Sequence, residues 1–419
     1  MTLFLLHCRP LLLPTVVVTL LSGGASAGDP APLSAQDFLG RVEKSHPSLP
    51  LLEAAVEQAE ASVTVAGVWA NPALSYDREE IFVAGRGQPE NFLRLELPLQ
   101  LSGRRGLEVE GARLGLDAAR KSASHDRAGL LLDALGVYWR AAGARQAVQL
   151  FQQERASVAR LISAVRARAA AGDTSGYELD RLELEVGVLD DALADAEADL
   201  ERWRRTLGLL VGAPGTSFEA ADPLGLPAAA ASLEGLQARV LASRPDLQAA
   251  RLRVSQAERE VAAAERGWVP DVVLSGGARN AVVSDSVAWG YVGGISLSVP
   301  VLDHGQGKLA RARAQLSQAE ATRSRLEQEV TAGLLLAHGT LEKLLAQAQR
   351  FEQQQPRLTR LVRRAELSFQ EGERPVFELL DAWRTARTLR LRQVELTRQA
   401  RLAELELARA TGTKPGDHP

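Results

Sequence analysis

The chain has almost no sulfur, with one cysteine, Cys8, and one methionine, Met1, among its 419 residues. Because Cys8 lies in a predicted signal peptide, the mature chain would have no thiol. This excludes disulfides, thiolate metal ligands and a cysteine nucleophile. It also excludes the N-terminal cysteine through which a bacterial lipoprotein is anchored, and the missing methionines exclude a thioether copper site.

Histidine is also scarce, and the motifs of catalytic centres are missing. The six histidines are scattered, without a His-x-x-x-His pair or an acidic cluster at ligand spacing. No Gly-rich phosphate loop follows a predicted strand. We therefore expect no enzyme activity, no cofactor and no resident metal ion. The formal net charge of −3 gives no indication of a nucleic-acid partner.

Long apolar runs are limited to the N-terminus. Residues 1–27 read as a secretory signal peptide, with Arg9 before an apolar stretch over 11–21 and the small-residue cleavage site Ala25-Ser26-Ala27. Pro10 and Pro14 interrupt that stretch, which is shorter than the ~20 apolar residues of a spanning helix. A secreted chain of this kind could be periplasmic, extracellular or an outer-membrane β-barrel.

An internal duplication with a period of about 200 residues organises the rest of the chain. Landmarks recur in the same order at offsets of 198 to 202 residues. They are His46-Pro47 and Arg244-Pro245, Trp69 and Trp268, Leu97-Pro98-Leu99 and Val299-Pro300-Val301, Gly172 and Gly372, and Gly212 and Gly412. So long a period excludes short solenoid repeats and indicates two copies of one large unit.

Each copy is predicted to contain a helix, a β-hairpin and two long helices. The first repeat covers residues 28–215, with its hairpin at about 73–101 and its long helices within 105–211. A connector covers 216–243. The second repeat covers 244–416, with its hairpin at about 271–301 and its long helices within 306–410. Helix-forming residues fill these long segments, and Pro356 alone interrupts them. A helix of about 65 residues would be ~98 Å long, which requires a coiled coil or a wall of helices.

The hairpin segments have the length and alternation of transmembrane strands. Leu93, Leu95 and Leu97 alternate with polar residues, and the run from Trp289 to Val299 alternates similarly. Predicted polar turns at 84–91 and 282–286 join each pair of strands. Trp289 and Tyr291 suit an interfacial aromatic belt. Four strands cannot close a barrel, so a membrane location would require several chains, and three would supply twelve strands.

This pattern resembles the TolC-type outer-membrane efflux proteins over essentially the whole mature sequence. Trp69-Ala70-Asn71-Pro72 and Leu97-Pro98-Leu99-Gln100-Leu101-Ser102-Gly103-Arg104-Arg105 are most similar to the cobalt–zinc–cadmium branch, although Ser102 replaces the first glycine of its turn. The resemblance implies a mainly α fold with a small β part. In it, a homotrimer forms a 12-stranded transmembrane β-barrel continued by a periplasmic α-helical barrel.

The resemblance also assigns roles to residues at the tips of the long helices. Gly172, Asp173, Gly372 and Glu373 would contact a periplasmic adaptor protein, in addition to forming the plain αα-hairpin turns that would otherwise account for them. Glu378 and Asp381, with Glu178 as their first-repeat counterpart, would form acidic rings that constrict the channel. The alternative is a helix N-terminal acid favoured by the macrodipole. Arg181 and Arg384 lie close enough to the tips to take part in ionic locks.

The predicted function is therefore the outer-membrane channel of a tripartite efflux system, located in the outer membrane and extending into the periplasm. Its predicted partners are the adaptor, an inner-membrane pump of the RND type and outer-membrane lipid. The cargo would be small solutes, with heavy-metal cations favoured. The alternative is a soluble periplasmic coiled-coil adaptor or scaffold, which would explain the long helices but not the two hairpins.

Overall fold

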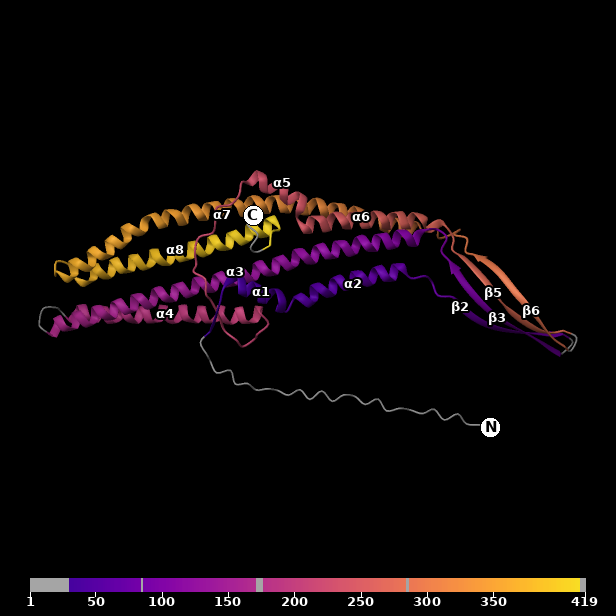
Figure 1. Cartoon of the computed structure of the whole chain (residues 1–419), viewed down its shortest axis with the longest axis horizontal. Helices are drawn as coiled ribbons and strands as arrows, with labels where there is room; N and C mark the ends of the chain where they lie inside the picture. Colours follow the sequence, from indigo (N-terminus) through magenta and orange to yellow (C-terminus); the bar gives the residue numbers. More distant parts are fainter. Residues whose placement is uncertain (1–29, 84–85, 171–175, 284–285, 415–419) are drawn as a thin grey trace, which may run out of the picture.

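The molecule is long and narrow, with a sheet at one end and the tips of two helical hairpins at the other (Figure 1). The computed structural model describes residues 30–83, 86–170, 176–283 and 286–414. The predicted signal peptide, residues 1–27, lies outside this range. In the described residues both repeats run the full length of the molecule side by side.

Six long helices form the body of the molecule. They are α2 (Leu49–Gly67), α3 (Arg104–Ala170), α4 (Gly176–Leu210), α6 (Pro245–Glu265), α7 (Gln306–Gln370) and α8 (Val376–Thr411). The four longest are α3 and α4 in the first repeat and α7 and α8 in the second. At 67 residues, α3 is about 100 Å long. α7 continues through Pro356 as an α-helix.

The sheet contains four antiparallel strands in the order β2-β3-β5-β6. Their bounds are β2 (Ala73–Val83), β3 (Arg86–Leu99), β5 (Val272–Val283) and β6 (Ser286–Leu297). The predicted polar turn at 84–91 was wrong, because β3 begins at Arg86 and pairs with β2 from there. The first residues of β3 are polar, but strand pairing depends on hydrogen bonds between backbone groups. Polar side chains therefore do not end the pairing of β2 with β3.

The register gives the sheet one apolar and one charged face, because residues paired across strands lie on the same side. The apolar face carries Leu74, Tyr76, Leu93, Leu95, Leu97, Leu274, Tyr291, Ile295 and Leu297. The opposite face carries Asp77, Glu79, Glu90, Phe92, Arg94, Glu96, Ser275 and Arg279. The alternation therefore concentrates apolar side chains on one face and charged ones on the other, although Arg78 and Glu80 of β2 lie on the apolar side and Phe92 lies on the charged side.

The helices form a layer with two free edges. Near the sheet, the order of packed neighbours is α2-α3-α6-α7. Towards the tips, α4 packs along α3, α3 against α8, and α8 along α7, as Figure 1 shows. Buried apolar residues of all four helices join at the tips, among them Val165, Leu182, Phe369 and Leu380.

A small waist holds the two repeats together. The short strands β1 (Ala31–Leu33) and β4 (Phe218–Ala220) pair in parallel beside α1 (Ala35–Ser45), whereas α5 (Leu233–Ser243) packs on α6 and α7. None of these four elements was predicted from the sequence. Tyr138 of α3 lies fully buried beneath β1, β4 and α1, and its hydroxyl donates to the Leu33 carbonyl at 2.9 Å and accepts from the Asp222 amide at 3.0 Å. Burial raises the pKa of Tyr138 to about 12, so its hydroxyl stays protonated.

Candidate functional site

The tip between α7 and α8 is a tight turn closed by backbone hydrogen bonds. Gly372 takes φ = 75°, a left-handed conformation that glycine adopts without steric cost. The amide of Glu373 donates to the Ser368 carbonyl at 3.0 Å. Pro375 then begins the next helix as its N-cap residue. Gly372 and Glu373 are exposed, and no atom lies within 4 Å of a Cβ built on Gly372, so the tip is accessible to a partner.

The structure brings Glu378 and Asp381 together on one face of α8, just above this tip. Glu378 accepts a hydrogen bond from Arg374 at 2.6 Å. Asp381 is exposed one helical turn further on. Both therefore lie where carboxylates could face a passage, although Glu378 already has a cationic partner in its own chain.

A groove beside these two acids is rich in arginine. It lies between α7 and α8, reaches α4, and is lined by Arg181, Arg364, Arg374 and Arg384 together with Glu378 and Asp381. Guanidinium groups therefore outnumber carboxylates in this groove. An acidic ring built from Glu378 and Asp381 would act in the field of these arginines.

The corresponding tip of the first repeat is only partly described. Gly172 and Asp173 lie outside the described residues. Glu178 is half-buried in the first turn of α4, at the position that corresponds to Glu378 in α8. The structure therefore places Glu178 in the neighbouring hairpin, apart from the acidic pair on α8.

A buried ionic cluster lies between the helices a few turns from the tips. Its central residue, Glu185, was not predicted from the sequence. Glu185 of α4 is only 3% exposed and accepts from the Arg384 Nε at 3.0 Å. Arg387, one turn further along α8, lies 3.5 Å from Glu185 and 3.3 Å from Glu154 of α3. Two acids of the first repeat thus bind two arginines of the second.

The pKa values of the two acids shift in opposite directions. Burial raises the pKa of Glu154 above its ordinary value, and the Arg387 charge offsets this only in part. Burial would also raise the pKa of Glu185, but hydrogen bonds and charges from Arg384 and Arg387 outweigh it and hold that pKa low. Glu185 is therefore the carboxylate that keeps its charge.

A signal for this cluster was present in the sequence. Glu185 lies between Leu182 and Leu189 in the apolar stripe of α4, where a charged residue is unexpected unless it has a partner. Arg384 was identified as a candidate for an ionic lock, but nothing in one sequence paired it with Glu185, which lies 199 residues away.

The charged face of the sheet contains a second compact cluster. The Phe92 ring is almost fully buried between the guanidinium groups of Arg94 and Arg279, whose centres lie 5.1 and 5.4 Å from the ring centroid. Arg94 lies 3.8 Å from Asp77, and Arg279 lies 2.6 Å from Glu90. Both arginines are therefore compensated by acids on the same face.

The apolar face becomes polar at the row that contains Trp289. Tyr76 donates to Asn91 at 2.7 Å, and Asn91 donates to Asn280, the residue paired with Trp289, at 2.8 Å. Trp289 is 73% exposed and Tyr291 is 94% exposed. Aromatic side chains that point away from the protein at an apolar–polar boundary suit a membrane interface.

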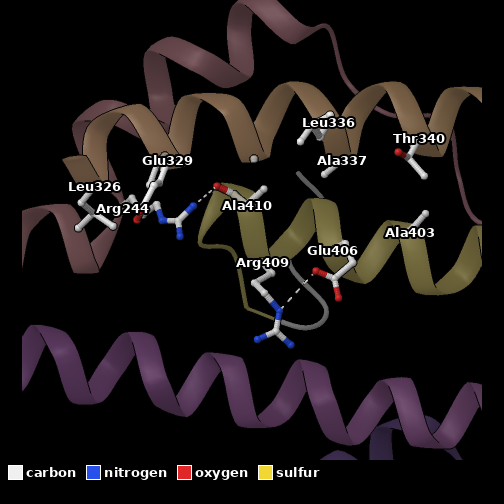
Figure 2. A pocket seen from close by; sticks show the side chains of 12 residues that line it. Arg244, Leu326, Glu329, Leu336, Ala337, Thr340, Ala403, Glu406, Arg409 and Ala410 are labelled. Atoms are coloured by element: carbon white, nitrogen blue, oxygen red, sulfur yellow. Dashed lines mark hydrogen bonds and ion pairs between the residues drawn. The ribbon is translucent and has the colours of Figure 1, made fainter. Parts of the chain in front are cut away.

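A further groove between α7 and α8 lies near the middle of the molecule (Figure 2). Its charged groups have partners within the chain. Arg244 binds Asp246 at 2.8 Å and donates to the Ala410 carbonyl, while Arg409 lies 3.7 Å from Glu406. Arg244 therefore satisfies a carbonyl in the last turn of α8, which is a structural role.

No described helix is both long and apolar enough to cross a membrane. Over the same ranges, no three side chains of His, Cys, Asp or Glu are grouped so that they could hold a metal ion.

Comparison with known families accounts for nearly all of this architecture. The model of the outer membrane efflux protein family matches residues 39–213 and 236–413, one match for each repeat. The chain belongs to this family. It is therefore the outer-membrane channel component of an efflux system, and the channel extends into the periplasm.

Curated relatives of this family member include two metal-resistance proteins. The cobalt-zinc-cadmium resistance protein CzcC of Cupriavidus metallidurans is 24% identical over 91% of the chain and 90% of its own length. The nickel-cobalt-cadmium resistance protein NccC of Alcaligenes xylosoxydans is 23% identical over 74% and 70%. The pyoverdine export outer membrane protein OpmQ of Pseudomonas putida is 26% identical over 63% and 56%.

Solved structures of outer-membrane channels share the fold. CusC superposes with a TM-score of 0.74 at 17% identity, over 90% of this chain and 92% of its own. VceC of Vibrio cholerae superposes with 0.73 at 18% identity, over 91% and 96%. At such identities the likeness concerns the fold alone. It confirms the predicted fold class, mainly α with a small β part in two repeats of a hairpin and long helices.

Proposed function

We propose that three copies of this chain form a continuous outer-membrane duct that exports heavy-metal cations in a tripartite efflux system. In this proposal the four-stranded sheets close a twelve-stranded barrel, and the helices continue it as a tunnel through the periplasm. The chain itself supplies the passage and has no catalytic role.

The observation that carries this proposal is that, in the described residues, the sheet and both helical layers each have two free edges. The sheet ends at β2 and β6, the helices near it end at α2 and α7, and the helices near the tips end at α4 and α7. A free strand edge cannot remain in lipid, because its backbone groups would have no hydrogen-bond partners. A ring of identical chains closes all three layers at once.

The face that would line the barrel favours cations. Asp77, Glu79, Glu90 and Glu96 outnumber Arg94 and Arg279 on the charged face of the sheet. Three chains would repeat this excess around one axis, and a ring of carboxylates concentrates cations. The apolar face, with Trp289 and Tyr291 at its boundary, would then contact lipid.

The metal cargo is supported by the relatives. CzcC and NccC are named for resistance to cobalt, zinc or nickel, and cadmium, and CzcC aligns with nine-tenths of this chain. OpmQ, which is named for pyoverdine export, supports a second candidate cargo, an organic solute such as a siderophore.

The proposed partners are a periplasmic adaptor and an inner-membrane pump of the RND type. The adaptor would bind the helical tips, where Gly372 and Glu373 are exposed. Gly172 and Asp173 are proposed as the matching contacts of the first repeat. The pump would supply the energy for export and select the substrate.

The first experiment tests the duct itself. We expect the mature protein in the outer-membrane fraction and, after detergent extraction, as a trimer by light scattering. A periplasmic monomer or dimer would contradict the proposal and favour the adaptor or scaffold alternative.

The second experiment tests the cargo. Deletion of the chain from its host should lower the tolerated concentrations of Co²⁺, Zn²⁺ and Cd²⁺ several-fold, and expression of the wild-type chain should restore them. Unchanged metal tolerance with intracellular retention of a siderophore would instead favour the organic cargo.

A further inference from the structure

We propose that the apolar face of the sheet binds the phosphorylated sugar headgroup of a membrane glycolipid, through one row of side chains near the turns. The row contains one residue from each strand, Arg78, Asn91, Asn280 and Trp289. The inference rests on the proposed membrane barrel and adds a lipid partner to it. The occupant is a glycolipid of the leaflet that lies farther from the helices.

Strand pairing places the four residues of this headgroup row side by side. Each member of the row is the registered partner of the next one, so all four side chains point to the same face of the sheet. With neighbouring strands about 4.8 Å apart, the row is about 14 Å wide. A surface of that width can make several contacts with one headgroup at the same time.

The headgroup row lies at the depth where a lipid headgroup is expected. Exposed leucines follow Asn91 along the chain, at Leu93, Leu95, Leu97 and Leu101. From Asn91 to Leu101 an extended chain rises about 33 Å, which is about 25 Å along the membrane normal at a strand tilt of about 40°. The apolar band of a transmembrane barrel has about the same height. The row therefore lies at the membrane boundary on the side away from the helices (Figure 1).

The polar groups of the row can bind phosphate and hydroxyl oxygens. The Arg78 side chain is 57% exposed and lies 4.0 Å from Glu80, which is too far for a hydrogen bond. This pair therefore leaves the guanidinium donors available for a bidentate contact with phosphate. Asn91 donates to the Oδ1 of Asn280 at 2.8 Å, which leaves the two N–H donors on the Nδ2 of Asn280 for a ligand oxygen.

Hydrogen bonds within the protein orient the two asparagines in advance. The Tyr76 hydroxyl donates to Asn91 at 2.7 Å, and Asn91 in turn donates to Asn280. This chain of hydrogen bonds crosses three strands, so the donors of Asn280 are positioned before a ligand binds. A boundary that met only water and unspecific lipid would not need such a chain, because water satisfies isolated amides.

Two aromatic rings distinguish a sugar from a simple phosphate. Trp289 lies in the headgroup row, and Tyr291 lies in the next row towards the helices. Both rings are mostly exposed and offer a flat apolar surface to the C–H face of a sugar, while their polar atoms stay in contact with water. A phosphate alone would use Arg78 but neither ring. A phosphorylated sugar uses all of these groups.

Lipid binding to the purified trimer tests this site. The first probe is lipid A, a phosphorylated disaccharide lipid, which is titrated into the detergent-solubilised trimer and followed by native mass spectrometry. Dephosphorylated lipid A supplies the sugar without the phosphate, and phosphatidylglycerol supplies a phosphate without the sugar. We expect the trimer to retain lipid A at concentrations about tenfold lower than either of the other two lipids.

Substitutions in the row should affect the three lipids differently. Arg78→Gln should weaken lipid A binding about tenfold and leave dephosphorylated lipid A unaffected, because it removes a charge-assisted contact with phosphate. Trp289→Leu with Tyr291→Leu keeps the surface apolar and should weaken both about fivefold. Glu80→Gln should strengthen lipid A binding about twofold, because it removes a carboxylate beside the phosphate. Arg94→Gln removes a cation from the opposite face of the sheet and is the matched control without effect.

The outcomes separate this inference from the proposed function. Equal retention of phosphatidylglycerol and lipid A, or lipid A binding that Arg78→Gln does not weaken, would overturn the glycolipid site and leave the trimeric duct intact. An equal loss of binding in Arg94→Gln would do the same. A mature chain recovered as a periplasmic monomer would overturn both the site and the duct.

Discussion

The two helical hairpins share a backbone plan but differ in charge. The α3–α4 hairpin of the first repeat and the α7–α8 hairpin of the second have almost the same helix lengths, and their tips lie at the same end of the molecule. Yet the tip-proximal half of α4 is acidic, while α7 and α8 carry a series of arginines there. Duplication preserved the shape, and divergence of side chains made the two copies complementary.

The buried ionic cluster around Glu185 depends on this difference in charge between the two hairpins. Glu185 of α4 corresponds, 200 residues on, to Thr385, and Arg384 and Arg387 of α8 correspond to Leu184 and Gly187. Two copies of either hairpin could not form this cluster, because each would supply only one sign of charge. The contact between the repeats thus depends on their difference.

Removal of Glu185 should therefore have the largest effect. Glu185→Ala leaves Arg384, whose side chain is 46% exposed, to water and leaves Arg387, 17% exposed, with Glu154 as its remaining acid partner. We expect a loss of about 2 kcal/mol in unfolding free energy, because hydrogen bonds to a buried charged group are lost while water and Glu154 compensate part of the arginine charge. The measurement is denaturant unfolding of the helical circular-dichroism signal in detergent.

Glu183, two residues away, provides the matched control. It pairs with Arg166 at 3.0 Å, but both side chains are about half exposed. Glu183→Ala should cost less than about 1 kcal/mol because water compensates exposed charges. Equal losses for the two variants would show that burial of the cluster contributes nothing.

The same cluster predicts a dependence on pH. Because the pKa of Glu185 is lowered in the folded chain, its contribution is present above the ordinary value of 4.5 and is lost as pH falls through its folded pKa. Each unit of lowering corresponds to about 1.4 kcal/mol. Glu154 has a raised pKa, so its protonation at low pH opposes this loss.

Glu185→Gln should therefore flatten the acid side of the stability profile. Melting temperatures between pH 6 and 3 should fall more steeply for the wild-type chain than for this variant. Parallel profiles would mean that Glu185 does not carry the acid sensitivity. Glu154→Gln should steepen the wild-type profile, because it removes the opposing group.

The sequence was sufficient for the architecture because its signals are periodic. Helix-forming residues, heptad spacing and strand alternation extend over tens of residues, and the duplication presents each signal twice. The waist was missed for the opposite reason. β1 and β4 contain three residues each and exist only because they pair across the chain, which no local pattern reveals.

The candidate site was predictable only in part. The acids at the tip of α8 follow from position in the sequence, and the structure does bring Glu378 and Asp381 together. The arginines around them come from α4, α7 and α8, and their meeting depends on packing between repeats. One sequence gives the residue types but not these neighbours.

The turn at Gly372 should show a smaller effect than the cluster. Gly372→Ala places a Cβ in a left-handed backbone conformation and should cost about 1 kcal/mol, measured as a lower melting temperature. Gly176→Ala, in the first turn of α4 with no atom near its Cβ position, should be neutral or slightly stabilising. A neutral Gly372→Ala would show that the tip tolerates other turns.

The smallest effect is expected at Glu378 and Asp381, the two acids near the tip of the second hairpin. Glu378→Ala with Asp381→Ala should lower the cation preference of single channels in a planar bilayer by only roughly twofold, because nearby arginines already oppose these carboxylates. Removal of Arg364 and Arg374 by alanine should raise the preference instead. An unchanged preference in the first variant would exclude an acidic ring at these positions. A much larger fall would mean that the arginines point away from the ion path and leave the carboxylates to act alone.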